Sequence, residues 1–236
     1  MRRRRRWAVL AVAATPLLLA PASNARTIQF AGRDWTVKTS AGRVGPGPNY
    51  FSDSSGNVWV DASGKLHLRI TRRGGRWYCA EIVGSGSLGY GSYRWDLESD
   101  LAQLDPNVVL GLFTWSNAPA ENHRELDIEL SRWSSATNLP GQYVVQPCTD
   151  ARNIYRFDWP RGLVLSTQSF SWTPGRVDFA SSTQGALLRS WSGTNLVPGA
   201  GDERPRLNLW LFRGRKPSDG REVEVVVSAF TFAPAP

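Results

Sequence analysis

The segment HRELDIELSRW, residues 123–133, carries a carboxylic acid at every second position. The acids are Glu125, Asp127 and Glu129, and the apolar residues that alternate with them are Leu126, Ile128 and Leu130. Successive side chains of a strand point to opposite faces, so this spacing predicts three acids on one face and three apolar side chains on the other. A pair of carboxyl groups held in different environments can act as nucleophile and proton donor.

This acid row has two interpretations, the solvated face of a half-buried strand and a catalytic site. Carboxylates about 6.6 Å apart along a strand repel by roughly 2.5 kcal/mol at an effective dielectric constant near 20. Such repulsion raises the pKa of one glutamate from ~4.3 toward ~6, where it can donate a proton. No lysine or threonine separates the acids to relieve the repulsion. We therefore favour the catalytic interpretation.

Aromatic and amide side chains lie in the neighbouring predicted strands. Aromatic faces stack on the C–H surfaces of sugar rings, and amides hydrogen-bond to sugar hydroxyls. The candidate sugar-binding residues are Tyr90, Tyr93, Phe113, Trp115, Gln142, Gln146, Asn208 and Trp210. A cleft with these side chains beside two glutamates is suited to glycoside hydrolysis. The spacing of the glutamates is compatible with both retaining and inverting geometry, because a curved sheet can bring the carboxyl groups to either separation.

The sequence predicts β structure almost throughout the region after residue 25. Short runs rich in Val, Trp, Tyr, Phe and Thr alternate with clusters of Gly, Pro, Asn and Ser. A hairpin is expected from 58–61 and 65–70. Further strands are expected at 76–84, 92–99, 107–116, 124–133, 142–148, 153–159, 163–172, 176–182, 186–192, 206–212 and 222–232. This pattern indicates one all-β domain, a sandwich or a barrel, over residues 26–236.

Residues 1–25 have the pattern of a secretory signal peptide. The basic run MRRRRRW precedes the apolar run AVLAVAATPLLLA, and small residues end the segment at Ala25. The apolar run is too short and too interrupted for a comfortable membrane span, although an uncleaved anchor is the alternative. We expect a secreted protein, extracellular or periplasmic, with no membrane association after cleavage. The arginine run also leaves the twin-arginine export route open.

The charge after cleavage gives little support for a nucleic-acid partner. Residues 1–25 hold five of the 28 Lys and Arg residues and none of the 20 acids, so the remaining chain has 23 against 20, a net charge of +3. Its arginines are scattered among acids. GSGSLG at 84–89 fits a dinucleotide-binding pattern, but a predicted strand follows it where such a site needs a helix. We expect a monomer that binds a polysaccharide.

The chain contains two cysteines, Cys79 and Cys148. In an oxidising compartment they could form a disulfide between two strands, and the alternative is a pair of buried free thiols. Two cysteines make a poor metal site when His67 and His123 are the only imidazoles. No metal site and no required cofactor are therefore expected.

The motif ELDIEL, residues 125–130, resembles the E-[LIV]-D-[IVF]-E signature of glycoside hydrolase family 16, which includes lichenases, laminarinases and xyloglucan-active enzymes. Its unbulged spacing is more similar to the lichenase and xyloglucan branches. The resemblance extends over most of the chain after the signal, through CAEI (79–82), GYGSYRW (89–95), NIYRFDWPRG (153–162) and LNLW (207–210). It implies a β-jelly roll of two curved antiparallel sheets whose concave face holds the substrate cleft.

The resemblance also implies a retaining endo-β-glycan hydrolase, or a transglycosylase that uses the same glycosyl-enzyme intermediate. Glu125 corresponds to the nucleophile, Glu129 to the general acid and base, and Asp127 to the residue that tunes their protonation. Glu81 corresponds to a sugar-contacting glutamate. His123 stands where lichenases often have Trp, which implies a role in substrate choice.

The sequence departs from the lichenase pattern at several cleft positions. Val83 replaces an arginine, Val144 and Gln146 replace aromatic residues, and Cys148 is the only partner left for Cys79. Some family members bind a structural Ca²⁺, for which this sequence identifies no ligands. Two other functions stay open: a non-catalytic carbohydrate-binding jelly roll, and a matrix scaffold whose acids bind Ca²⁺.

Overall fold

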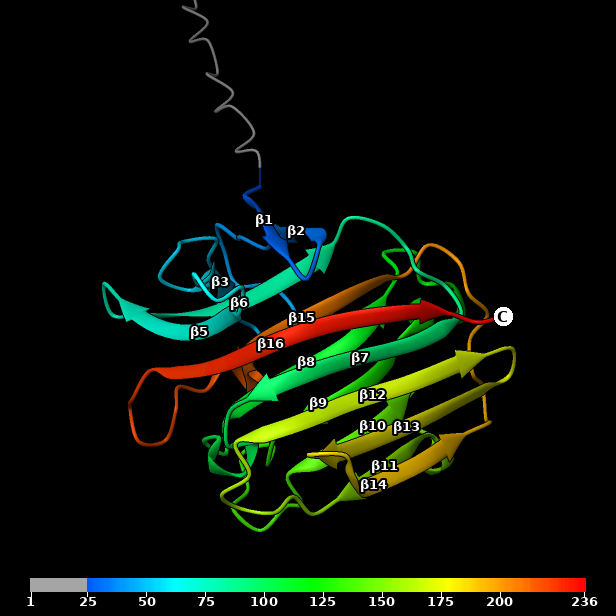
Figure 1. Cartoon of the computed structure of the whole chain (residues 1–236). Coiled ribbons are helices and arrows are strands. Elements are labelled where there is room, and N and C mark those ends of the chain that lie inside the picture. The colour runs from blue at the N-terminus through cyan, green and yellow to red at the C-terminus, as the bar shows by residue number, and fades with distance from the viewer. Residues whose placement is uncertain (1–24) are drawn as a thin grey trace, which may run out of the picture.

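The computed structural model describes residues 25–236. The predicted signal peptide lies outside these residues, apart from Ala25. Within the described part of the chain, no helix has the length and apolar character needed to cross a membrane. Most of residues 25–236 form two large antiparallel sheets that face each other (Figure 1).

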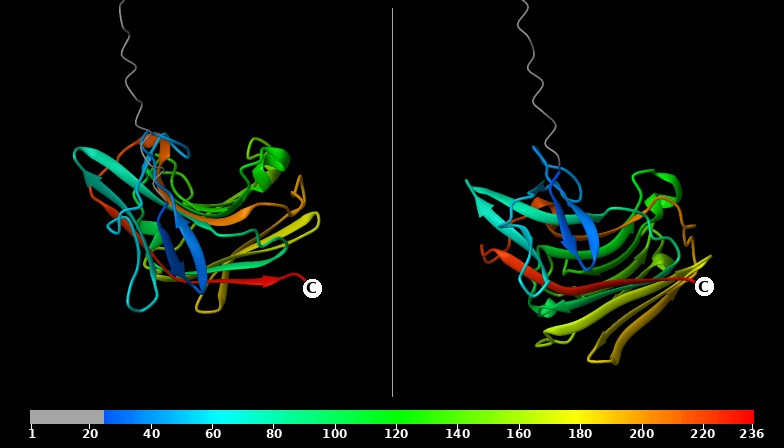
Figure 2. Two further views of the ribbon diagram at one scale, coloured as in Figure 1. Left: turned by 90° about the horizontal axis from the view of Figure 1, so that it is seen from above. Right: turned by 45° about the horizontal axis from the view of Figure 1, so that its top comes forward.

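The first sheet is concave and has the strand order β11-β10-β9-β8-β15-β6. Its strands are β11 (Ile154–Phe157), β10 (Gly141–Val145), β9 (Leu126–Leu130), β8 (Val108–Trp115), β15 (Arg204–Leu211) and β6 (Arg76–Gly84). The hairpin of β1 (Thr27–Phe30) and β2 (Arg33–Val37) extends it beyond β6, and β3 (Tyr50–Phe51) pairs with β6 in parallel. Figure 2 shows how strongly this sheet curves.

The second sheet covers the convex side of the first. Its strands, in spatial order, are β4 (Val58–Val60), β5 (Leu66–Arg73), β16 (Val223–Pro234), β7 (Gly91–Glu98), β12 (Leu165–Thr173), β13 (Arg176–Thr183) and β14 (Ala186–Gly193). The long β5–β6 hairpin joins the two sheets at one edge. Four short 3₁₀ segments complete the described chain: η1 (Leu101–Gln103), η2 (Ala120–Arg124), η3 (Ala151–Asn153) and η4 (Phe212–Gly214).

The core lies between the two sheets. Leu126, Ile128 and Leu130 of β9 are fully buried in it, and each such side chain contributes about 1.5–3 kcal/mol relative to an exposed one. Aromatic rings connect the layers: Tyr143 of β10 stacks on Phe179 of β13 with ring centroids 5.1 Å apart. The alternation of β9 therefore fixes which face of this strand turns toward the second sheet.

The sequence predicted this architecture and most of the strands, but it missed β1 and β2. Ala31 and Gly32, which join these strands, both have positive φ, as a tight hairpin turn requires. The strand expected at 124–133 is also shorter than predicted. It ends at Leu130, and Trp133 and Ser134 both adopt a left-handed backbone conformation.

The predicted disulfide between Cys79 and Cys148 is wrong, and so is its alternative of two buried thiols. Both cysteines are free, Cys79 in the core and Cys148 on the surface. Burial raises the pKa of the Cys79 thiol to about 12, which makes it unreactive. Cys148 follows β10 in a turn, where its backbone N–H donates to the side-chain oxygen of Gln146 over 2.8 Å.

We expect one thiol to react in the native protein and two after unfolding. Ellman titration of the wild type and of Cys148→Ser tests this, because the variant should show no reactive thiol until it is denatured. A reducing agent should leave the melting temperature of the wild type unchanged. Two protected thiols in the native wild type, or a melting temperature that falls on reduction, would contradict free cysteines.

Candidate active site

One row of residues crosses the concave sheet from β10 to β6. Residues opposite one another in antiparallel strands point to the same face. The register therefore aligns, from strand to strand, Gln142, Glu129, Gly111, Asn208 and Glu81. Position 111 leaves no room for a side chain, because a Cβ atom there would lie 2.5 Å from Oδ1 of Asn208. The row places the predicted proton donor between two amide side chains.

A second row, one step along the strands, carries the other acid of β9. Asp127 lies opposite Phe113 of β8, which lies opposite Arg206 of β15. Glu125 comes directly before β9, at the end of η2. The strand geometry thus brings the three acids to one face, as the sequence predicted.

The three acids line a cavity of about 370 Å³ on the concave face. The other predicted site residues in its wall are Glu81, Phe113, Trp115, Asn208 and Trp210. The wall also contains residues that the sequence did not suggest: Lys38, Gly45, Pro46, Gly111 and Arg206. The sequence could have indicated Arg206, because it lies two residues before Asn208 in the same strand and its side chain therefore points to the same face. Lys38 lies after β2 and had no such signal.

The acids are largely withdrawn from solvent, since Asp127 is buried and Glu125 and Glu129 are half-buried, and this argues against the solvated-strand interpretation. Asp127 is only 4% exposed. Burial raises the pKa of Glu125 to about 8, and the charge of Glu129 adds to this rise. A hydrogen bond from protonated Asp127 and the nearby charge of Arg206 act in the opposite direction. The sequence attributed the raised pKa to repulsion alone, whereas loss of solvent is the larger cause.

Two amide side chains, Gln142 of β10 and Gln146 of the turn after it, donate hydrogen bonds to the other two acids. Burial raises the pKa of Glu129 to about 7, against a hydrogen bond of 2.6 Å from Nε2 of Gln142. Burial and the charges of Glu125 and Glu129 hold the pKa of Asp127 well above its ordinary value. Gln146 donates to Asp127 over 3.1 Å. These amides therefore orient the carboxyl groups and are not part of the cavity wall.

Glu81 lies in the cavity wall, but its carboxylate is already paired. It is 1% exposed, with Nζ of Lys38 2.8 Å from Oε2 and Nη1 of Arg206 3.2 Å from Oε1. The predicted sugar-contacting glutamate therefore holds two cations at the edge of the cavity. Since both oxygens are paired, the cations are the groups left to face a ligand.

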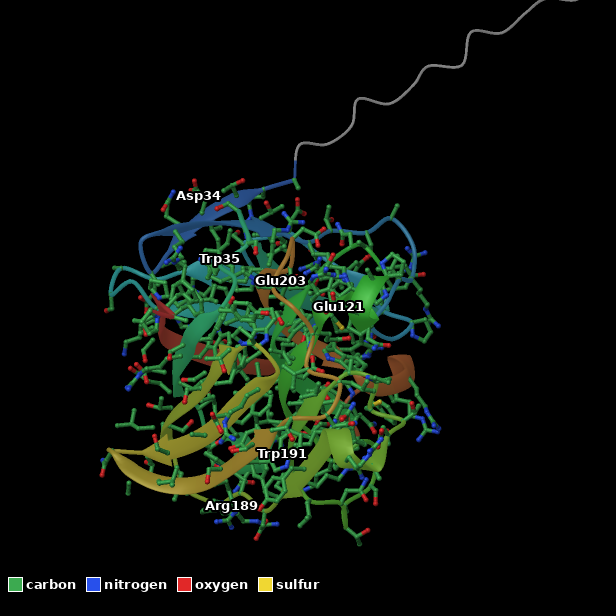
Figure 3. All side chains as sticks on the ribbon, turned by 90° about the vertical axis from the view of Figure 1, so that its right-hand side faces the viewer. Asp34, Trp35, Glu121, Arg189, Trp191 and Glu203 are labelled. Carbon is green, nitrogen blue, oxygen red and sulfur yellow. The ribbon has the colours of Figure 1, made fainter. Side chains whose placement is uncertain are left out.

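His123 belongs to one rim of the cavity. Its ring stacks on Trp115, with centroids 4.0 Å apart and planes within 10°. Residues 121–124 all have positive φ, and the turn is held by contacts to the loop before β15. Glu121 accepts from the backbone N–H of Gly199 over 2.5 Å, and Ser116 donates to Asp202 over 2.7 Å. Figure 3 labels Glu121 on this rim.

The predicted cleft positions of Tyr90 and Tyr93 are wrong. Tyr93 is fully buried in the core, where it stacks on Phe170. Tyr90 packs edge-on against Trp172, with centroids 5.0 Å apart, and does not line the cavity. Tyr93 belongs to β7 and Tyr90 directly precedes it, and β7 lies in the second sheet, so neither residue faces the concave surface.

The burial of Glu125 predicts a pH-dependent cost to stability. Its pKa is raised from 4.5 to about 8 in the folded chain, so the protonated form is favoured by folding. The corresponding stability is present below pH 4.5 and is lost as the pH rises toward 8. Glu125→Gln cannot ionise, so its melting temperature should rise relative to the wild type across this interval.

Melting curves of both proteins between pH 4 and pH 9 test this expectation. Glu222→Gln, at an exposed position directly before β16, is the control for loss of one carboxyl group and should show no such divergence. A constant difference between Glu125→Gln and the wild type over the interval would refute a buried carboxyl with a raised pKa.

The described chain offers no group of three or more His, Cys, Asp or Glu side chains arranged to hold a metal ion. No family model and no curated protein matches the sequence. Solved structures with similar folds include a Bacillus licheniformis β-glucanase (16% identity, TM-score 0.63), covering 85% of this chain and 92% of that one.

A second similar structure is an immunostimulatory antigen and pseudo β-1,3-glucanase of Mycobacterium tuberculosis (19% identity, TM-score 0.64, covering 86% of this chain and 91% of that chain). A third is the GH16 protein of the Bacteroides ovatus mixed linkage glucan locus, in complex with its G4G4G3G product (13% identity, TM-score 0.63, covering 84% of this chain and 94% of that chain). The predicted resemblance to glycoside hydrolase family 16 is thus confirmed at the level of the fold, and this chain has the β-jelly roll of these β-glucanases.

Proposed function

We propose that this chain is a secreted, retaining endo-β-glycan hydrolase of glycoside hydrolase family 16. The observation that carries the proposal is the row of Glu125, Asp127 and Glu129, buried or half-buried, in the wall of a cavity on the concave sheet. Two glutamates of raised pKa beside aromatic side chains provide the groups that glycoside hydrolysis needs. The fold shared with β-glucanases supports a β-linked polysaccharide as substrate.

In the first step, the Glu125 carboxylate attacks the anomeric carbon while the bond to the leaving oxygen breaks. Glu129 gives its proton to that oxygen, so a glycosyl-enzyme ester and a free sugar end are formed. In the second step, Glu129 takes a proton from water as the water attacks the anomeric carbon, which releases Glu125. A sugar hydroxyl in place of water gives transglycosylation.

The two roles require an ionised Glu125 beside a protonated Glu129. Burial raises the pKa of both glutamates, so the ionised form of Glu125 needs additional stabilisation. Positive charge develops on the sugar ring beside Glu125 in the transition state, and this charge favours the ionised nucleophile. Asp127 contributes by keeping its proton and donating a hydrogen bond to the same carboxylate, which lowers the pKa of Glu125.

A non-catalytic carbohydrate-binding protein is the second candidate. The similar Mycobacterium tuberculosis structure is described as a pseudo β-1,3-glucanase, so this fold accommodates proteins of that kind. Val83 and Val144 flank the row of Asp127 on the concave sheet. They offer no hydrogen bond to a sugar where the family has larger polar or aromatic groups. In the main proposal the hydrolase acts as a monomer and requires no cofactor, and we assign no residues to a Ca²⁺ site.

Glu125→Gln should lower kcat on the order of 10³-fold or more, because an amide cannot form the glycosyl-enzyme ester. Reducing-end assays on mixed-linkage glucan, laminarin, xyloglucan and galactan-type polymers measure this loss on whichever substrate the wild type cleaves. Glu222→Gln should retain wild-type activity. Hydrolysis by Glu125→Gln at the wild-type rate, or wild-type binding without any product, would rule out the proposed enzyme.

Glu129→Ala should regain turnover of an activated aryl β-glycoside when azide is added. Such a leaving group needs no proton, and azide can enter the space of the lost carboxyl group to attack the intermediate. The product should be a β-glycosyl azide, with retained configuration, as NMR will report. In the matched variant Glu125→Ala the azide would replace the nucleophile and give the α-product. An α-product from Glu129→Ala would exclude the retaining mechanism.

A further inference from the structure

A second, smaller cavity of about 100 Å³ adjoins the catalytic one across the loop of residues 43–50. Gly45 and Pro46 of this loop line the catalytic cavity, whereas Arg43 and Tyr50 line the second. Strand β15 and the segment after it also contribute to both cavities, because Trp210 lines the first cavity and Gly214 lines the second. A chain leaving the catalytic cavity over this rim would therefore meet the second cavity.

Two arginines in this wall share one aromatic ring. The guanidinium carbon of Arg43 lies 5.7 Å from the centroid of Tyr50, and that of Arg76 lies 5.4 Å from it. Both arginines are exposed, and neither forms an ion pair with any residue of 25–236. No acid lines this cavity. Two guanidinium groups thus lie against one ring, and no acid of the described residues pairs with either.

The surrounding segments hold this surface in place. The β5–β6 hairpin turns at Gly74 and Gly75, both with positive φ, which gives a tight connection next to Arg76. Arg73 on the other strand is fixed by hydrogen bonds of 2.6 Å to Asn57 and 2.8 Å to Ser52. Arg213 and Arg215 are exposed and flank Gly214, which lines the same cavity. The hairpin lies near the segment before β16 (Figures 1 and 2), where the backbone N–H of Arg72 donates to Glu222.

We propose that this basic aromatic surface, built on Arg43, Tyr50, Arg76 and Trp77, binds the sulfate or carboxylate groups of an acidic polysaccharide. The proposal rests on the proposed function, in that the bound polymer is the substrate whose chain continues from the catalytic cavity. Guanidinium forks match sulfate and carboxylate oxygens, and exposed aromatic faces accept sugar rings. The wall of the catalytic cavity holds four acids and two cations, and both cations are paired with Glu81, whereas the wall of the second cavity holds two cations and no acid. Anionic substituents are therefore favoured at the second cavity.

Binding without turnover tests this surface separately from catalysis. Glu125→Gln serves as the parent, and its affinity is measured by electrophoresis in gels containing alginate, a sulfated galactan or neutral mixed-linkage glucan. Adding Arg43→Gln and Arg76→Gln should weaken binding to the acidic polymers at least fivefold and leave binding to the neutral glucan unchanged. Retardation by alginate alone or by the sulfated galactan alone identifies the group that is bound.

The control for charge is the parent with Arg161→Gln and Arg176→Gln, two exposed arginines in the loop after β11 and in β13. It should bind the acidic polymers as the parent does, and melting curves should show that both double variants fold. Equal losses in both double variants, no binding of either acidic polymer, or equally tight binding of duplex DNA would each overturn the proposal. If the acidic polymers bind but the wild type cleaves none of the polysaccharides, the surface stands and the proposed hydrolase fails.

Discussion

The burial of three carboxyl groups on one face of β9 is the constraint on which the rest of the site depends. The strand can keep them there because Leu126, Ile128 and Leu130 are fully buried on its other face. A register slip of one residue would turn the acids into the core and the apolar side chains into the cavity. Core packing therefore fixes the orientation of the face that carries the acids.

The same burial determines the chemistry available to the acids. A carboxyl group that loses water favours its proton, and the neighbouring acids add to this effect. The amides of Gln142 and Gln146 offset part of the cost by donating hydrogen bonds to Glu129 and Asp127. They come from β10 and the turn that follows it, so two adjacent strands supply both the acids and the groups that orient them.

The sequence was sufficient for features that depend on local alternation. It predicted the face of the acids, most strands, and the jelly roll through its resemblance to a family. It did not predict Lys38, which comes from beyond β2 to pair with Glu81. Tyr90 and Tyr93 were misplaced because residue type suggested a cleft, whereas sheet membership decides which side a strand faces. Neither alternative left open for the two cysteines was right, because their separation and burial depend on strand order, which the sequence alone does not reveal.

The pairing of Glu81 links the catalytic cavity to the basic rim. Lys38 and Arg206 neutralise this buried acid and remain at the cavity edge. Without them Glu81 would add a fourth charge beside three acids whose ionisation is already opposed by burial. Lys38 and Arg206 are thus each paired with an acid, whereas Arg43 and Arg76 form no ion pair with any residue of 25–236. The acids of the first cavity do not attract an anionic polymer, whereas the positive potential near Arg43 and Arg76 does. Charge alone would therefore place the anionic substituents outside the cavity that holds the three acids.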